Sequence, residues 1–323
     1  MHDHRAPAWL PGGNLQTIWT ALFSRPHLTE SPAYRRERWT APDGDFIDVD
    51  HVDAATPGAP RLVLFHGLEG SSQSRYALAF ALAAQARGWG CTLPHFRGCS
   101  GVPNLAPRAY HSGDFEEIGW MLRRVCAAHG APVYAVGVSL GGNALLRWAE
   151  EAGETARATV RAVAAISSPL DLAAAGRAID RGFNWAVYAR MFLKTMKPRA
   201  LAKLELHPGL FDRERLLAAR TLYEFDDVFT APLHGYRDTP DYWARASAKP
   251  HLHAVRVPAL ALNARNDPFV PGASLPAAHE VGRHVTLWQP PHGGHVGFTT
   301  GPFPGSVRAL PEAVLGWLQA AAA

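Results

Sequence analysis

The five residues Gly137-Val138-Ser139-Leu140-Gly141 place a serine between two glycines in the pattern G-x-S-x-G. The pattern alone is weak evidence for a site, but its setting is informative. Residues 133–138 form a continuous apolar run typical of a buried parallel strand, and a helical pattern resumes at Gly141. A sharp strand-to-helix turn needs the glycines because neighbouring backbones leave no room for a Cβ, and it exposes the serine hydroxyl. We therefore interpret Ser139 as a candidate nucleophile.

A serine hydroxyl needs an imidazole to accept its proton and a carboxylate to orient that imidazole. Asp267 follows a predicted strand at 259–262 through a short loop, and Pro268 stiffens that loop. His295 lies between the last predicted strand, at 284–288, and a terminal helix. These positions place both partners in loops beyond strand ends, so we expect Ser139, Asp267 and His295 to act together.

Two alternatives remain open for these partners. Asp267 could be a loop aspartate that only caps a turn. His292 competes with His295, since both lie in the same loop. We prefer His295 because two glycines precede it and allow the loop to deliver its ring, whereas His292 directly follows a proline pair.

The segment His66-Gly67-Leu68-Glu69-Gly70 follows a predicted strand at 61–65. The backbone N–H of Leu68, together with that of Leu140, is placed to bind the negative oxygen that forms when Ser139 attacks a carbonyl. The alternative is a glycine turn needed for packing alone. We expect His66 to support this loop rather than to transfer protons.

Composition excludes several other classes of protein. The 32 basic and 28 acidic residues are spread along the 323-residue chain, without a run that would indicate a nucleic-acid surface. Three cysteines without CxxC spacing fit a reducing compartment and indicate neither zinc nor a redox pair. Two His-x-His pairs, at 2–4 and 251–253, lack further ligands at useful spacing, so we expect no metal. Cys99 lies between glycines with no base tied to it, so we interpret residues 97–101 as a loop lining the site.

We also expect neither a signal peptide nor a membrane span. The first residues lack an apolar core, and no stretch reaches the roughly 18 apolar residues that a span needs. The expectation is a cytoplasmic protein that needs no cofactor, does not insert stably into membranes, binds no nucleic acid and acts on a small molecule. The sequence does not predict its oligomeric state.

The pattern of elements predicts an α/β fold. Apolar strand runs alternate with helices, which favours a mostly parallel sheet covered by helices on both faces, and residues 35–52 read as an antiparallel hairpin. Residues 170–257 are helix-prone and aromatic, and we expect them to form a helical cap inserted between the core segments 1–169 and 258–323. Seven cap aromatics could line an apolar pocket, although such residues are more often core: Phe183, Trp185, Tyr188, Phe192, Tyr223, Phe225 and Trp243.

The motifs taken together resemble the YheT-like branch of the α/β hydrolases, over most of the chain. The matching segments are Asn14-Leu15-Gln16-Thr17, residues 66–70, residues 95–101 with Asn104, residues 110–113, residues 137–143, residues 225–227 with 230–232, residues 266–269 and residues 293–298. The resemblance implies an α/β-hydrolase fold and puts Ser139, Asp267 and His295 on the family's triad positions. Asn266 departs from the acidic residue expected there, but the triad does not depend on it.

The expected activity is hydrolysis of carboxylic esters with short to medium acyl chains through an acyl-enzyme. The chain-length expectation rests only on the absence of a membrane-anchoring segment. The same triad serves acyltransferases, thioesterases, amide hydrolysis and lipid esterases, and some animal relatives resemble phospholipases. A binding protein without turnover is a further alternative, disfavoured because all three residue types are present in order.

Overall fold

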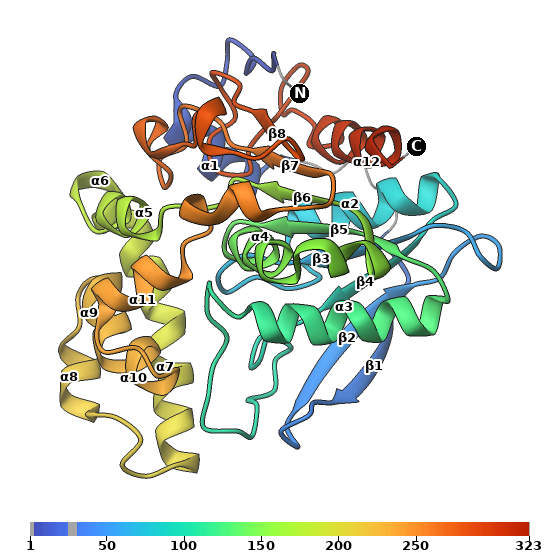
Figure 1. Ribbon diagram of the computed structural model, residues 1–323. Coiled ribbons are helices and arrows are strands. Elements are labelled where there is room, and N and C mark those ends of the chain that lie inside the picture. Colours follow the sequence, from blue (N-terminus) through green and yellow to red (C-terminus); the bar gives the residue numbers. More distant parts are fainter. Residues whose placement is uncertain (1–2, 25–30, 323) are drawn as a thin grey trace.

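The computed structural model describes residues 3–24 and 31–322. Its centre is an eight-stranded sheet in the order β1-β2-β4-β3-β5-β6-β7-β8 (Figure 1). The pairs β1–β2 and β2–β4 are antiparallel, and every later pair is parallel, which confirms the predicted hairpin and mostly parallel sheet. The strands are β1 (Arg35–Thr40), β2 (Phe46–Val52), β3 (Arg61–Phe65), β4 (Gly90–Pro94), β5 (Val133–Val138), β6 (Val160–Ile166), β7 (Ala259–Leu262) and β8 (Val285–Trp288).

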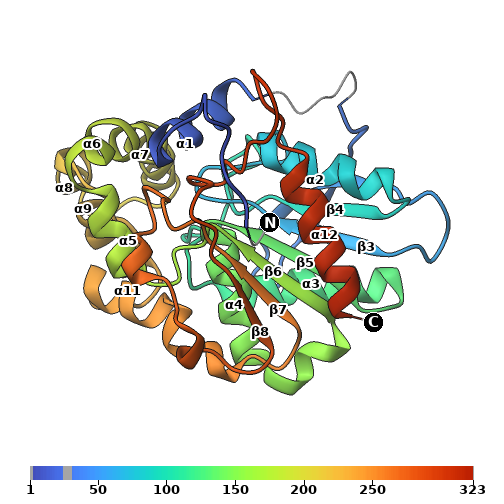
Figure 2. The same ribbon diagram turned by 90° about the horizontal axis from the view of Figure 1, so that it is seen from above.

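Two helical layers cover the sheet, because its central strands are apolar on both faces. In β3, Val63 and Phe65 pack in the cluster that contains α3 (Phe115–His129) and α4 (Leu140–Ala152). Leu62 and Leu64 point the other way, into the cluster that contains α2 (Arg75–Ala86) and α12 (Ala309–Ala321). Figure 2 shows α2 and α12 side by side on that face. The continuous apolar runs in the sequence thus correspond to strands buried on both sides.

A group of helices lies between β6 and β7 in sequence and beside the sheet in space (Figure 1). They share an apolar cluster of their own that includes Leu193, Leu216 and Phe229. Two π-helical turns, η2 (Trp185–Ala189) and η3 (Asp226–Thr230), interrupt these helices, and such turns are frequent at functional sites. The α-helices are α5 (Leu172–Ile179), α6 (Gly182–Asn184), α7 (Arg190–Leu206), α8 (Arg213–Ala218), α9 (Leu222–Phe225), α10 (Ala231–Leu233) and α11 (Thr239–Ala246).

One helix was absent from the predicted elements: α1 (Gly13–Leu22), which packs beside the carboxyl-terminal part of the core. Its buried residues are Gln16, Thr17 and Thr20, so the side that faces the protein is polar. A search for apolar periodicity therefore does not find it. Short 3-10 turns complete the fold: η1 (Gly153–Ala158), η4 (Lys249–Ala254), η5 (Gly272–Ser274) and η6 (Ala278–Glu280).

Candidate active site

Ser139 lies in the single-residue turn between β5 and α4, with backbone angles of φ 54° and ψ −121°. L-residues rarely adopt this conformation, so the turn is held by its surroundings. The glycines on either side are needed because a Cβ on Gly141 would lie 2.4 Å from the His66 carbonyl oxygen. A Cβ on Gly137 would lie 2.4 Å from the carbonyl oxygen of Gly141. The sharp turn expected from the G-x-S-x-G pattern is present.

The structure brings the three predicted site residues into one hydrogen-bonded row. His295 Nε2 lies 3.0 Å from Ser139 Oγ, and His295 Nδ1 lies 2.9 Å from Asp267 Oδ2. The other oxygen of the buried Asp267 carboxylate accepts hydrogen bonds from the backbone N–H groups of Phe269 and Val270. With Asp267 accepting the proton on Nδ1, the imidazole presents an unprotonated Nε2 to the serine hydroxyl. His295, and not His292, occupies the position next to Ser139.

The loop after β3 leaves one backbone donor free beside Ser139. The N–H of Gly67 donates to the Tyr76 hydroxyl, and that of Glu69 donates to the Tyr110 hydroxyl. Between them, the N–H of Leu68 donates to no residue in the part of the chain that the structure describes. The same holds for Leu140, the first residue of α4. Leu68 and Leu140 both line the cavity with Ser139, where an oxyanion would form.

His66 supports this loop. Its ring nitrogens lie 2.8 Å from the Gly67 carbonyl oxygen and 3.0 Å from the Phe96 backbone nitrogen. Because the ring is buried, its pKa is lowered to about 3, so it stays neutral at physiological pH. A neutral ring whose two nitrogens are both engaged holds the loop in place.

Helix α1 positions the loop that carries His295. Thr17 Oγ1 accepts the backbone N–H of His295 at 2.8 Å, and Gln16 Oε1 accepts that of Gly293 at 2.9 Å. Asn266 donates to Gln16 Oε1 and accepts from the Gly294 N–H, so it joins the acid loop to the histidine loop. No residue of α1 has a type or spacing that predicts a role in the site. The only signal in the sequence is the Asn14-Leu15-Gln16-Thr17 motif.

A cavity of about 420 Å³ opens beside Ser139, between the core and the helices of 170–257. Of the seven aromatics considered from sequence, Phe192, Phe225 and Trp243 line it. The other four, Phe183, Trp185, Tyr188 and Tyr223, do not, and Tyr188 instead packs against Phe269. Most of the wall is apolar, with Met196 and Phe229 adding to the aromatics. Such a wall suits an apolar ligand group.

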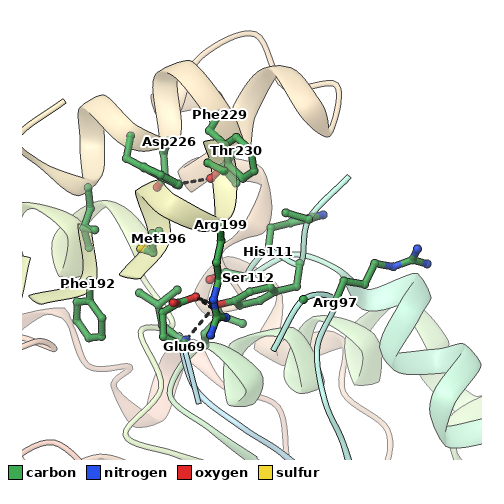
Figure 3. A pocket seen from close by; sticks show the side chains of 18 of the residues that line it. Glu69, Arg97, His111, Ser112, Phe192, Met196, Arg199, Asp226, Phe229 and Thr230 are labelled. Carbon is green, nitrogen blue, oxygen red and sulfur yellow. Dashed lines mark hydrogen bonds and ion pairs between the residues drawn. The ribbon is translucent and has the colours of Figure 1, made fainter. Parts of the chain in front are cut away.

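An ion pair crosses the cavity wall close to the loop after β3 (Figure 3). Arg199, on α7, lies 3.1 Å from Glu69 Oε1, and the Tyr110 hydroxyl donates to the same oxygen. Arg199 also donates to the Cys99 sulfur at 3.3 Å. Burial raises the pKa of the Cys99 thiol to about 12, so it is not a thiolate at neutral pH. Gly98 and Gly101 line the cavity, in keeping with the expected loop beside the site.

Asp226, a partly buried residue on η3, also lines the cavity (Figure 3). Asp226 accepts hydrogen bonds from Thr230 Oγ1 at 2.6 Å and from Trp243 Nε1 at 2.9 Å. Burial raises its pKa to about 6, even though both hydrogen bonds favour the charged form. Sequence reasoning did not single out Asp226 as a site residue, because only the fold brings it to the cavity.

Neither a metal cluster nor a membrane span is found in residues 3–24 and 31–322. No three His, Cys, Asp or Glu side chains in that part of the chain are grouped to hold a metal ion. His2, one member of the first His-x-His pair, lies outside the described residues. Within the described chain, no helix is long and apolar enough to cross a membrane.

Comparison with known proteins agrees with the fold. The sequence model of the family described as alpha/beta hydrolase fold matches residues 60–302. The YheT protein of Escherichia coli, which carries an esterase name, is 40% identical over 89% of this chain and 84% of its own length. The mouse protein named Phospholipase ABHD3 is 31% identical over 89% of this chain and 74% of its own. A solved esterase of Pyrococcus furiosus, Pf2001, shares the fold with a TM-score of 0.57 at 13% identity, covering 90% and 93% of the two chains.

Proposed function

Because this chain belongs to the α/β hydrolase family and to its YheT-like branch, we propose that it is a serine esterase with Ser139, His295 and Asp267 as its catalytic residues. The observation that carries the proposal is the row of hydrogen bonds from the serine hydroxyl through the imidazole to the buried carboxylate. That row supplies the two things a serine nucleophile lacks, a proton acceptor and a means of stabilising the resulting imidazolium.

The reaction proceeds in two steps. Ser139 Oγ attacks the ester carbonyl while His295 Nε2 takes its proton, and His295 then donates that proton to the departing alkoxide. A water molecule that the same nitrogen deprotonates then attacks the acyl-enzyme, the bond between the acyl carbon and Ser139 Oγ breaks, and His295 returns the proton to Ser139 Oγ as the acid leaves. Asp267 keeps the ring in the productive tautomer throughout. The free N–H groups of Leu68 and Leu140 stabilise the negative oxygen of both tetrahedral intermediates.

The proposed substrates are esters with an acyl chain that fits the apolar cavity, with short and medium chains preferred. The helices of 170–257 act as a cap in this proposal, since they supply the apolar wall at Phe192, Phe225 and Trp243. The name of the mouse relative favours a second candidate, a lipid esterase that uses the same triad. Acyl transfer to an alcohol and thioester cleavage remain variants of the same chemistry.

The test combines covalent labelling with turnover. We expect a fluorophosphonate probe to label the wild-type protein and the control variant Ser274→Ala, at a partly exposed serine that does not line the cavity, but not Ser139→Ala. Nitrophenyl esters of increasing acyl length should be hydrolysed by the first two proteins, with a fall in kcat of at least about 10⁴-fold in Ser139→Ala. Unlabelled wild-type protein would overturn the proposal in favour of a binding protein. Faster turnover of long-chain lipids would favour the lipid esterase.

A further inference from the structure

Helix α1 is amphipathic in the opposite sense to an ordinary surface helix. Its buried side carries Gln16, Thr17 and Thr20, whereas Leu15 and Leu22 on its outer side are 51% and 57% exposed. A surface helix normally buries its apolar stripe and exposes its polar one. The polar side of α1 is used by the histidine loop, but nothing in the described part of the chain covers the apolar side.

The apolar surface continues from α1 onto the loop near the carboxyl terminus. Trp19 contacts Phe23 and Phe303, with ring centroids 4.8 and 5.3 Å apart. The Phe303 side chain is 69% exposed. The indole of Trp19 donates to the Pro304 carbonyl, which fixes this loop on α1. The result is a contiguous apolar surface rather than a set of scattered side chains.

The surface also continues onto the neighbouring cap helix. The segments α6, η2 and α7 form one helical run from Gly182 to Leu206, and α1 lies beside it (Figure 2). The Tyr188 hydroxyl donates to Asn14 Oδ1 on α1 at 2.9 Å. On the outer side of the run, Phe183 and Met191 are more than half exposed and Val187 is also exposed.

Positive charge accompanies these apolar residues. Residues 181–204 contain six basic residues and no acidic one, although the whole chain has nearly as many acids as bases. Arg181, Arg190 and Lys194 are exposed, and none of them forms an ion pair with another described residue. We call the combined surface the α1–cap face, defined as Leu15, Leu22, Phe23, Phe183, Val187, Met191 and Phe303 with Arg181, Arg190 and Lys194.

We propose that the α1–cap face docks onto the surface of an anionic lipid bilayer. Exposed aromatic and aliphatic side chains beside unpaired Arg and Lys are the composition of segments that lie in the membrane interface. Anionic headgroups attract such basic residues, while the apolar side chains enter the boundary of the acyl chains. A protein partner would have to bring acidic side chains to neutralise the same cations, whereas lipid phosphates supply that charge uniformly.

Docking in this orientation places the active site next to the lipid. The inner side of α7 lines the cavity with Phe192 and Met196, and its outer side carries Met191 and Lys194 on the α1–cap face. Helix α1 in turn holds the loop of His295. Helices α1 and α7 thus each connect the docking face with the catalytic site. The docking surface goes beyond the proposed function, because it is independent of which ester is cleaved.

The experiment measures co-sedimentation of the full chain with vesicles. One set contains phosphatidylcholine alone, and the other contains phosphatidylcholine with roughly one third phosphatidylglycerol, which gives the vesicles a negative surface potential. We expect binding to the anionic vesicles, weakened by salt, and much weaker binding to the zwitterionic ones. The variants Phe183→Ser with Met191→Ser, and Arg190→Gln with Lys194→Gln, should each bind about 10-fold more weakly or worse.

Matched controls separate the face from general surface effects. Leu206→Ser removes an exposed leucine at the other end of α7. Arg123→Gln with Arg283→Gln removes two exposed charges that lie outside the α1–cap face. Both control proteins should bind vesicles like wild type. All variants should keep wild-type hydrolysis of a water-soluble short-chain ester, and Ser139→Ala should keep vesicle binding. Three outcomes would each overturn the docking proposal, whatever the result for esterase activity. They are equal binding to anionic and zwitterionic vesicles, no binding to either, and a dimer, seen by light scattering, that the α1–cap face variants abolish.

Discussion

Thr17 and His295 are 278 residues apart in sequence, yet the threonine Oγ1 accepts the histidine backbone N–H at 2.8 Å. The same hydroxyl donates to the Gly13 carbonyl one turn earlier in α1. One side chain therefore fixes the position of the proposed general base relative to the N-terminal helix. The relationship explains why a helix at the edge of the fold buries polar residues.

Thr17→Val should lower activity by disturbing the histidine loop. Valine keeps the shape but removes the acceptor, so the partly buried N–H of His295 loses its partner, at a cost of about 1–3 kcal/mol. A shift of the imidazole by a fraction of an ångström should lower kcat by roughly 10- to 100-fold. Thr17→Ser, which retains the hydroxyl, should recover most of both losses. Steady-state kinetics and thermal unfolding of wild type, Thr17→Val and Thr17→Ser measure both effects. Equal kcat values for the three proteins would show that α1 does not position His295.

Ser139→Gly should be more stable than Ser139→Ala, and we expect neither variant to be active. At φ 54° and ψ −121° a Cβ is strained by about 1–3 kcal/mol, while the extra freedom of glycine in the unfolded chain offsets about 0.5–1 kcal/mol. We expect a net gain of about 1 kcal/mol for the glycine variant. Denaturant unfolding of the two variants measures this difference directly. If the alanine variant is the more stable one, the backbone at the nucleophile is not strained.

The sheet and the proposed triad could be predicted from sequence because their signals are local. A buried strand followed by G-x-S-x-G identifies Ser139, and the order of strands places Asp267 and His295 at the same edge. The role of Thr17 could not be predicted in this way, since a polar residue on a short N-terminal helix has no periodic signal. Phe183 and Phe192 illustrate the same limit: both are aromatic residues of the helical segment 170–257, but only the folded helix decides that one faces solvent and the other the cavity.

Arg199→Gln should weaken substrate binding more than it weakens the fold. The Arg199–Glu69 ion pair joins α7 to the loop that carries Leu68. Its arginine is partly exposed, so solvent screening limits its contribution to stability to about 1 kcal/mol. We expect kcat/KM for a soluble ester to fall by about 3- to 10-fold, mainly through KM, with little change in the unfolding temperature. Arg199→Lys keeps the charge, so its kcat/KM should lie between those of wild type and Arg199→Gln. A fall confined to kcat would instead place the effect on the position of the loop that carries Leu68.

Asp226→Asn should change how stability depends on pH. The pKa of Asp226 is about 6 in the folded protein and has its usual value of 3.8 in the unfolded chain. Between these two pH values the folded protein keeps a proton that the unfolded chain has released. The stabilisation from this proton is fully present below the unfolded value and is lost as pH rises through 6. The unfolding free energy of wild type relative to Asp226→Asn should therefore fall by about 2 kcal/mol between pH 4.5 and pH 7. Urea unfolding at a series of pH values measures this difference; a constant offset between the two proteins would mean that Asp226 is ionised throughout the range.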